Sequence, residues 1–298
     1  MTSGDVRSAL LEQPALWRSR VAWLDGVRAL ACLAVMAFHA QVPGFGHGYL
    51  GVDAFFVLSG FLAASQLGDG RSAGRWLFRR WARLHPALLV LVLLVGPLAV
   101  LGGASPGGTV AVAVFVYSPW FLGADGGLLG HTWSIMVEVV AYAVAAALLP
   151  FVLRFHRRFV AALLVVLAAA AVFAPWAAVR LVRPEGILVG WALGALYQRG
   201  FPRAVTAVAR PLGHPALTAV GGRTYSLYLW HLPVFQLLKF HTPVTGVTLT
   251  LLQFAVAFVA AELSFRFVEA PTRHWLYRWG DTRLFARRPS GVVGAAAT

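Results

Sequence analysis

Residues 24–40 read LDGVRALACLAVMAFHA, an almost uninterrupted apolar run with one arginine near its start and one histidine near its end. A helix of about 17 to 25 apolar residues is long enough to cross the hydrocarbon core of a bilayer. Comparable runs follow one another as far as Phe267, without the alternating pattern of a membrane barrel. The sequence therefore predicts an all-α fold, a polytopic transmembrane helical bundle.

The composition agrees with this fold class. Hydrophobic residues make up 59% of the 298 residues and charged residues 12%, against roughly 25% charged in a soluble domain. A net charge of +14 would suggest a nucleic-acid partner in a soluble protein, but here the arginines lie between apolar runs and can orient the chain. We expect the lipid bilayer as a partner and no nucleic acid. Cys32 is the only cysteine, so we expect no disulfide and no metal.

The apolar runs predict about eight spans, with a range of eight to ten. We expect them at residues 24–42, 49–67, 84–101, 132–153, 159–179, 184–199, 222–239 and 246–268. The short segment 109–122 decides the orientation. If it does not cross, nearly all arginine clusters lie on the side of both termini, and if it crosses, every later loop is inverted.

We therefore predict that both termini are cytoplasmic in a multi-pass protein of the bacterial cytoplasmic (inner) membrane. Residues 1–20 form a cytoplasmic tail without the apolar core of a signal peptide, residues 21–271 the transmembrane domain, and residues 272–298 a basic, partly disordered cytoplasmic tail.

The first span contains the sharpest functional signal. Arg28 and His39 are eleven residues apart, which is just over three helical turns and a rise of about 16 Å, so they share one face of the helix. An ionisable residue inside a span suggests a function by default. The alternative is a histidine that is hydrogen-bonded to a neighbouring helix for structural reasons.

Two of the acids within later spans, Asp53 and Glu138, are candidate functional residues. Asp53, in the second span, is expected either to pair with His39 or to cap its own helix, and Gly60 stands at a depth where small residues permit close packing. Glu138 follows Trp133 and Ser134 in the segment HTWSIMVEVVAYAV. A lone carboxylate in lipid requires a partner, which we expect to be His39 or an arginine, or else a hydrogen bond to another helix.

The approach to the third span, RSAGRWLFRRWARLHPALL at 71–89, concentrates arginines. Arg80 and Arg83 are three residues apart and, on a helix, point in one direction, so with Arg75 they can bind phosphate. A plain topology signal is the competing interpretation. Near the end of the chain, the aromatic residues of GGRTYSLYLWHLPV, among them Tyr228, are expected mainly to anchor the helix, and His231 is a weaker candidate than His39.

Together these segments resemble acyltransferase family 3, which includes bacterial polysaccharide O-acetylases and macrolide O-acyltransferases. The matching segments occur in the family order and are LDGVRALACLAVMAFH, GVDAFFVLSGF, RRWARLHP, HTWSIMVEVVAY, RPEGILVGWALGAL, YSLYLWHLP and VEAPTRH. Two features depart from the family pattern. Few residues separate Gly200 from YSLYLWHLP, so a pair of spans is missing, and Val139 and Val140 replace a second acid and a glutamine.

The resemblance implies an acyl-CoA donor, usually acetyl-CoA, used from the cytoplasmic side, and a hydroxylated acceptor such as a glycan, a lipid-linked sugar or a secondary metabolite. The family's functional motifs fall on seven residues: Arg28, His39, Arg80, Arg83, Trp133, Ser134 and Glu138. With Asp53, Arg75, Tyr228 and His231, which the residues themselves suggest, eleven residues are assigned expected roles. We expect catalysis by His39, Glu138 and Asp53, donor binding by Arg28, Arg75, Arg80 and Arg83, and substrate or structural contacts by Trp133, Ser134, Tyr228 and His231. His39 is expected to act as a general base or to take the acyl group itself. The competing hypotheses are a proton-coupled transporter and an inactive, shortened family member.

Overall fold

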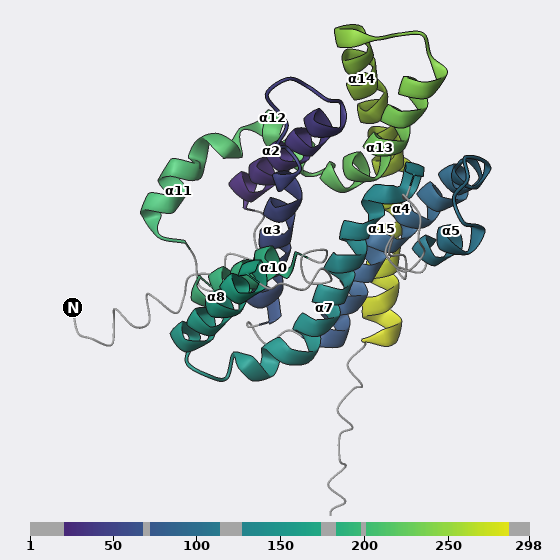
Figure 1. The fold of residues 1–298 in the computed structure, drawn as a ribbon. Coiled ribbons are helices and arrows are strands. Elements are labelled where there is room, and N and C mark those ends of the chain that lie inside the picture. The colour runs from purple at the N-terminus through teal and green to yellow at the C-terminus, as the bar shows by residue number, and fades with distance from the viewer. Residues whose placement is uncertain (1–20, 68–71, 114–126, 174–182, 198–200, 286–298) are drawn as a thin grey trace, which may run out of the picture.

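The computed structural model describes residues 21–67, 72–113, 127–173, 183–197 and 201–285. Every regular element in these residues is a helix, so the predicted all-α fold is confirmed (Figure 1). The elements before the connection at 198–200 are α2 (Ala22–His39), α3 (Leu50–Leu67), α4 (Ala73–Leu101), α5 (Pro106–Ala113), η2 (Gly127–Thr132), α7 (Trp133–Val152), α8 (Arg157–Phe173) and α10 (Pro184–Leu196). Those after it are α11 (Arg203–Ala209), η3 (Arg210–Gly213), α12 (Pro215–Gly221), α13 (Thr224–His241), α14 (Gly246–Ser264), η4 (Phe265–Glu269), α15 (Ala270–Trp279) and η5 (Gly280–Leu284).

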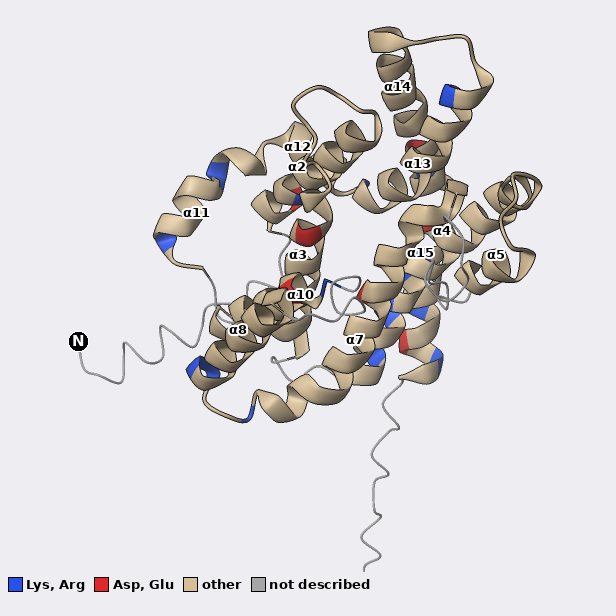
Figure 2. Ribbon diagram, in the orientation of Figure 1, with Lys and Arg blue, Asp and Glu red and all other residues tan. Residues whose placement is uncertain are grey.

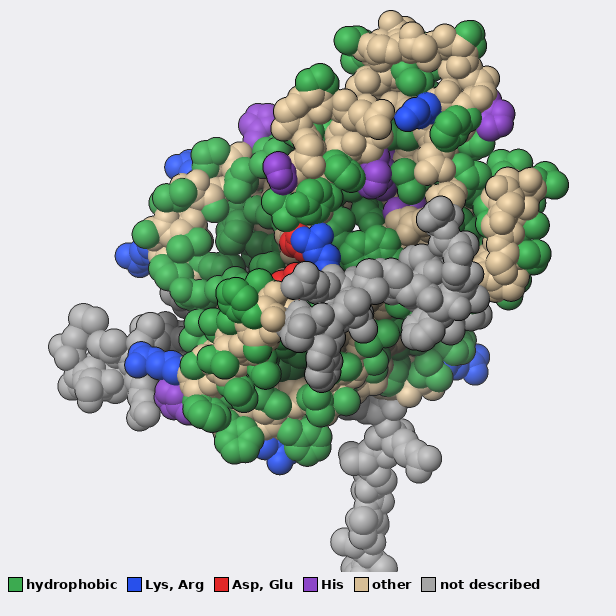
Figure 3. Space-filling view, in the orientation of Figure 1, with side chains coloured by type: hydrophobic (Ala, Val, Ile, Leu, Met, Phe, Trp, Pro, Cys, Tyr) green, Lys and Arg blue, Asp and Glu red, His purple; other side chains and the backbone are tan. Residues whose placement is uncertain are grey.

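The helices have the length and surface of a multi-pass membrane protein. Five segments of the described residues are long and apolar enough to cross a bilayer: Ala22–His39, Leu50–Leu67, Ala73–Leu101, Gly127–Val152 and Gly246–Leu284. Hydrophobic side chains cover much of the face shown in Figure 3, which suits contact with lipid. Each of the eight predicted spans coincides with a helix, whereas their number and orientation in the membrane stay predictions. Segment 109–122 is described only as far as Ala113, the end of α5.

Helix α4 begins about ten residues before the predicted third span. It is 29 residues long, about 43 Å at 1.5 Å per residue, and so exceeds the hydrocarbon core of about 30 Å. The side chain of Ser72 caps it by accepting a hydrogen bond from the Arg75 amide. The arginines that precede the apolar run therefore lie on a helix, and Arg80 and Arg83 share a face of it.

Helices α3 and α10 pack closely because glycines line their contact. A Cβ atom on Gly60 would overlap the carbonyl oxygen of Ile187, and one on Gly190 would overlap that of Val57. The expectation that Gly60 serves close packing is confirmed. Gly186, Gly190 and Gly194 follow one another at intervals of four residues, the small-residue pattern of membrane helix pairs, and α8 covers the other side of α10.

The last helices run past the predicted end of the membrane domain. Helix α14 passes through the π-helical turn η4 into α15, and the helical path ends at Leu284 (Figure 1). Helix α15 packs on α4, where the Tyr277 hydroxyl donates to the Arg79 carbonyl at 3.1 Å. Residues 272–284 of the predicted tail are thus helical, and residues 286–298 lie outside the described part.

Candidate active site

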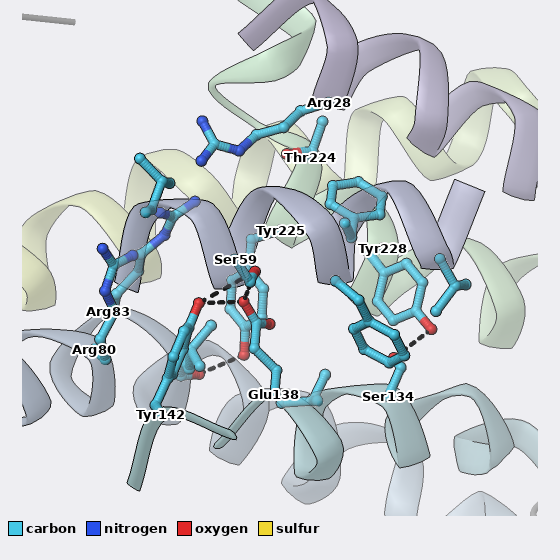
Figure 4. A pocket seen from close by; sticks show the side chains of 16 residues that line it. Arg28, Ser59, Arg80, Arg83, Ser134, Glu138, Tyr142, Thr224, Tyr225 and Tyr228 are labelled. Carbon is cyan, nitrogen blue, oxygen red and sulfur yellow. Dashed lines mark hydrogen bonds between the residues drawn. The ribbon is translucent and has the colours of Figure 1, made fainter. Parts of the chain in front are cut away.

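A pocket lies where α2, α3, α4, α7 and α13 meet (Figure 4). Its lining combines apolar and polar side chains. The apolar side chains are Val52, Phe55, Phe56, Leu62, Leu84 and Ile135. The polar side chains are Arg28, Ser59, Arg80, Arg83, Ser134, Glu138, Tyr142, Thr224, Tyr225 and Tyr228. Six of the eleven residues singled out from the sequence therefore line one pocket, although they come from four separate helices.

Three guanidinium groups gather at one end of the pocket (Figure 4). Arg28 pairs with Asp25 at 3.0 Å. Arg80 donates to the Gln66 side-chain oxygen at 2.9 Å and lies over the rings of Trp76 and Tyr142. The Nε of Arg83 is buried without a hydrogen-bond partner among the described residues. This end can therefore accept an anionic group, because arginine presents planar donors that suit phosphate or carboxylate.

The structure divides the arginine cluster of α4 into two groups with different partners. Arg75 and Arg79 do not line the pocket but bind Asp281 on η5, at 2.9 and 2.7 Å. Their side chains are 43% and 40% exposed, so these ion pairs are near the surface and stabilise little. Arg75, a predicted donor-binding residue, is placed instead where the C-terminal helix joins α4.

Glu138 lies in the middle of the pocket and is the single acid among the described lining residues. Its Oε1 accepts hydrogen bonds from the hydroxyl groups of Ser59 on α3 and Tyr142 on α7. Of the partners considered from the sequence, the hydrogen bond to another helix is the one observed, rather than His39. Tyr142 follows Glu138 by four residues, one helical turn, a spacing that could have identified it as a partner.

The opposite end of the pocket carries hydroxyl groups (Figure 4). The Ser134 Oγ lies 2.7 Å from the Tyr228 hydroxyl, and the latter donates to the His131 carbonyl at 3.0 Å. Trp133, the neighbour of Ser134 in the sequence motif, is outside the lining and packs edge-on against Phe56 at 6.0 Å between ring centroids. Tyr228 thus forms part of the site rather than only a membrane anchor.

A cluster of three histidines adjoins this end, next to Tyr228. His39 Nδ1 lies 3.1 Å from His231 Nε2, and the His231 ring also packs against those of His131 and Tyr228, at 5.3 and 5.4 Å. His231 is fully buried and His131 is 4% exposed. The sequence ranked His231 below His39 and did not single out His131 for chemistry. Among the residues that the structure describes, no group of three His, Cys, Asp or Glu side chains is placed to hold a metal ion.

Proline explains how His131 is held. Pro233 lies inside α13 and has no amide hydrogen, so the Leu229 carbonyl four residues earlier lacks its usual helical donor. His131 Nε2 supplies the missing hydrogen bond at 3.0 Å. A buried carbonyl is thereby satisfied, and η2, which precedes α7, is fixed against α13.

Arg28 and His39 both lie on the side of α2 that faces α13. Arg28 lines the pocket together with Thr224, the first residue of α13. The Cys32 thiol contacts the Thr224 carbonyl at 3.8 Å, and His39 contacts His231, about two turns further along α13. The rise of about 16 Å between Arg28 and His39 therefore runs alongside α13.

The hydrogen-bond partner of Asp53 is an arginine and not a histidine. Its carboxylate binds the guanidinium of Arg183, the N-cap residue of α10, at 2.5 Å, and this guanidinium also lies over the Tyr49 ring. Neither partner expected from the sequence, His39 or the start of its own helix, is the one observed. The pair instead ties α3 to the start of α10.

Comparison with known proteins agrees with the sequence motifs. The model of the acyltransferase 3 domain matches residues 21–203. The peptidoglycan O-acetyltransferase OatA of Listeria monocytogenes is 27% identical over 352 residues, covering 86% of this chain and 56% of the relative. The "Putative O-acetyltransferase" of Staphylococcus aureus (strain COL) is 24% identical, covering 84% of this chain and 57% of the relative. No solved structure matches the chain.

The chain spans about half the length of the curated relatives it matches. The alignment with the Listeria protein is longer than the 298 residues of this chain, so that relative carries residues within the aligned region that are absent here. The family model nevertheless covers more than half of the chain, from α2 to the start of α11. The chain therefore belongs to acyltransferase family 3.

Proposed function

We propose that this protein is a membrane O-acyltransferase that moves an acyl group, acetyl above all, from acyl-CoA to a hydroxyl group of a carbohydrate or another small acceptor. The observation that carries the proposal is the pocket among the apolar helices, with three arginines at one end and hydroxyl groups at the other. The histidine cluster lies outside the lining, next to Tyr228. Both ends suit the chemistry of an acyl-CoA.

The arginine end suits the phosphates of coenzyme A. Arg28, Arg80 and Arg83 face one acid of the described lining, Glu138, and Arg28 is also paired with Asp25, so an anion that enters still meets an excess of positive charge. Each charge-assisted hydrogen bond to a phosphate contributes about 1.5 to 3 kcal/mol. The apolar lining residues Phe55, Phe56 and Ile135 suit the less polar pantetheine arm and the acyl group.

The spacing of Arg28 and His39 along α2 also suits an extended donor. The rise of about 16 Å from Arg28 to His39 is comparable to the reach of a pantetheine arm, so phosphates bound at the arginine end would bring the thioester toward Tyr228 and the histidines. Basic residues in the turn between α7 and α8 and along α15 support a cytoplasmic location for the arginine end (Figure 2). In that orientation the donor enters from the cytoplasm of a bacterial cell.

In the proposed reaction His39 acts as a general base. Its imidazole takes the proton from the acceptor hydroxyl, the oxygen attacks the thioester carbonyl carbon, and the C–O bond forms as the C–S bond breaks. The leaving thiolate then takes the proton back from His39, so that charge and atoms balance. The same geometry accommodates transfer through an acyl-histidine, in which the imidazole nitrogen attacks first and the acceptor hydroxyl second.

The acceptor class follows from the relatives. One of them is named a peptidoglycan O-acetyltransferase, so a glycan hydroxyl is the first acceptor to test. Purified protein in proteoliposomes would receive isotope-labelled acetyl-CoA and a panel of glycans, lipid-linked sugars and hydroxylated metabolites, with acetylated products detected by mass spectrometry. We expect product from at least one acceptor.

The decisive variant is His39→Ala, and His47→Ala in the exposed α2–α3 loop is its control. We expect transfer to fall about 10²- to 10⁴-fold in the first variant and to persist in the second, since a positioned base contributes about that much. Transfer at the wild-type rate by His39→Ala would overturn the mechanism. Substrate flux across the proteoliposomes with no acyl transfer to any acceptor would favour a transporter instead.

A further inference from the structure

We propose that His231 is the positioning residue for His39, and that it fixes the imidazole tautomer in which the Nε2 of His39 carries the free lone pair. The inference rests on the proposed function in assigning the base role to His39. Two hydrogen bonds and the full burial of His231 support this role.

The tautomers follow from the hydrogen-bond partners, taken one after another. His231 Nδ1 lies 2.7 Å from the Tyr228 carbonyl oxygen, which can only accept, so Nδ1 of His231 must carry the hydrogen. A neutral imidazole has one donor and one acceptor, and Nε2 of His231 is therefore an acceptor. That Nε2 lies 3.1 Å from Nδ1 of His39, so His39 donates through Nδ1 and its Nε2 is unprotonated.

The surroundings keep His231 neutral. The ring is fully buried, and the described groups around it are the imidazoles of His39 and His131 and the rings of Tyr228 and Phe235. A cation there would be desolvated beside two other imidazoles without a carboxylate to compensate it. His131 donates through Nε2 to the Leu229 carbonyl, so its Nδ1 is also unprotonated and contributes no charge.

This arrangement suits a base that cycles between two protonation states. When His39 takes a proton on Nε2, its Nδ1 still donates to His231 Nε2, so the hydrogen bond persists in both states. In serine-protease triads an aspartate has this orienting role. The two acids expected to be possible partners of His39 are engaged elsewhere, since Asp53 binds Arg183 and Glu138 binds hydroxyl groups.

Two substitutions at His231 distinguish the effect of its hydrogen bond to His39 from the effect of its packing. His231→Gln places an acceptor oxygen near the position of Nε2, whereas His231→Leu fills the space without an acceptor. His241→Ala is the matched control on the same helix, because His241 is exposed and its Nδ1 bonds only to the Leu237 carbonyl within α13. Thermal unfolding of each variant reports whether the fold persists.

The first measurement is independent of enzymatic activity. Nitrogen-15 NMR of the histidine-labelled protein distinguishes protonated from unprotonated ring nitrogens, and the His39 signals are assigned by their loss in His39→Ala. We expect protonated Nδ1 and unprotonated Nε2 in the wild type, in His231→Gln and in His241→Ala, and a shift toward protonated Nε2 in His231→Leu. A His39 whose tautomer is the opposite, or unchanged in His231→Leu, would overturn the proposal.

The second measurement is kinetic. We expect kcat to fall about 10- to 100-fold in His231→Leu, because a His39 in the wrong tautomer loses part of the rate enhancement that a general base contributes. The KM for acetyl-CoA should stay within about twofold of the wild-type value. His231→Gln should recover most of that decrease. Equal decreases in both variants would mean that His231 acts by packing alone, which overturns the proposal. If wild-type protein transfers no acyl group while the NMR tautomers are as expected, the proposed function fails and the orienting contact stands.

Discussion

Replacing Arg83 by glutamine tests the division of the α4 arginines into a donor-binding group and a structural group. Arg83 lines the pocket, and its buried Nε has no hydrogen-bond partner among the described residues, so at least this donor is not already used within the protein. Arg75 is eight residues earlier on the same helix, yet it binds Asp281 outside the pocket. The matched pair Arg83→Gln and Arg75→Gln removes the same charge from both places.

The expected magnitude follows from the strength of a hydrogen bond between a guanidinium and a phosphate. Such a bond contributes about 1.5 to 3 kcal/mol, and 1.4 kcal/mol corresponds to a tenfold change in a dissociation constant. Arg83→Gln should therefore weaken acetyl-CoA binding about 10- to 150-fold. Arg83→Lys keeps the charge but not the planar fork, so its effect should lie in between. Arg75→Gln removes a half-exposed ion pair, and donor affinity should stay within about threefold.

The assay is equilibrium binding to detergent-solubilised protein, with acetyl-CoA and with acetyl-pantetheine, which lacks the phosphates. If Arg83 binds a phosphate, its replacement should weaken only the binding of acetyl-CoA, because the interaction is absent from the truncated donor. Thermal unfolding confirms that each variant is folded. Equal weakening of both donors, or an equal decrease in Arg75→Gln, would refute the assignment.

Three further outcomes concern the helices around the pocket. Gly190→Ala should destabilise the protein by about 1 to 3 kcal/mol in thermal unfolding, because the new methyl group overlaps the Val57 carbonyl, whereas Gly46→Ala, which enters open space, should not. Glu138→Leu should cost about 1 to 3 kcal/mol for each hydroxyl left without an acceptor, and Glu138→Gln less, as measured by the same unfolding. Asp281→Asn should lower stability by at most about 1 kcal/mol at low salt, with no difference remaining at high salt and acyl transfer unchanged.

The helices at the predicted spans were predictable because apolar length is a direct signal of a membrane helix, and five of the described segments are long and apolar enough to cross a bilayer. The start of α4 was not predicted from hydropathy, because residues 73–83 are too basic to count toward an apolar run. Arginine, alanine and leucine in this stretch nevertheless all favour a helix. Its Ser72 cap was a signal that hydropathy ignores. The helical path through Leu284 was missed for the same reason, because charge concealed a helix that packs on α4.

The sequence predicted which residues belong to the site better than it predicted which partners they contact. Arg28, Arg80, Arg83 and Glu138 stood out because charges are costly within or near a span, and the structure brings them into one pocket. Their partners depend on how distant helices pack, which periodicity does not reveal. Asp53 meets an arginine 130 residues away, and the partner of His39 is 192 residues away on α13.

The architecture also bears on whether a shortened family member can keep its site. The connection that is short compared with the family pattern lies between α10 and α13. Within it, η3 and α12 pack on the start of α2. The contact is close, because a Cβ on Gly26 would overlap the Leu212 carbonyl and one on Gly221 would overlap the Asp25 carbonyl. The described lining residues all come from α2, α3, α4, α7 and α13. Residues 201–221 therefore hold the helix that carries Arg28 without forming the pocket wall, so a shorter connection that still packs on α2 leaves both the arginine end and the histidine cluster assembled.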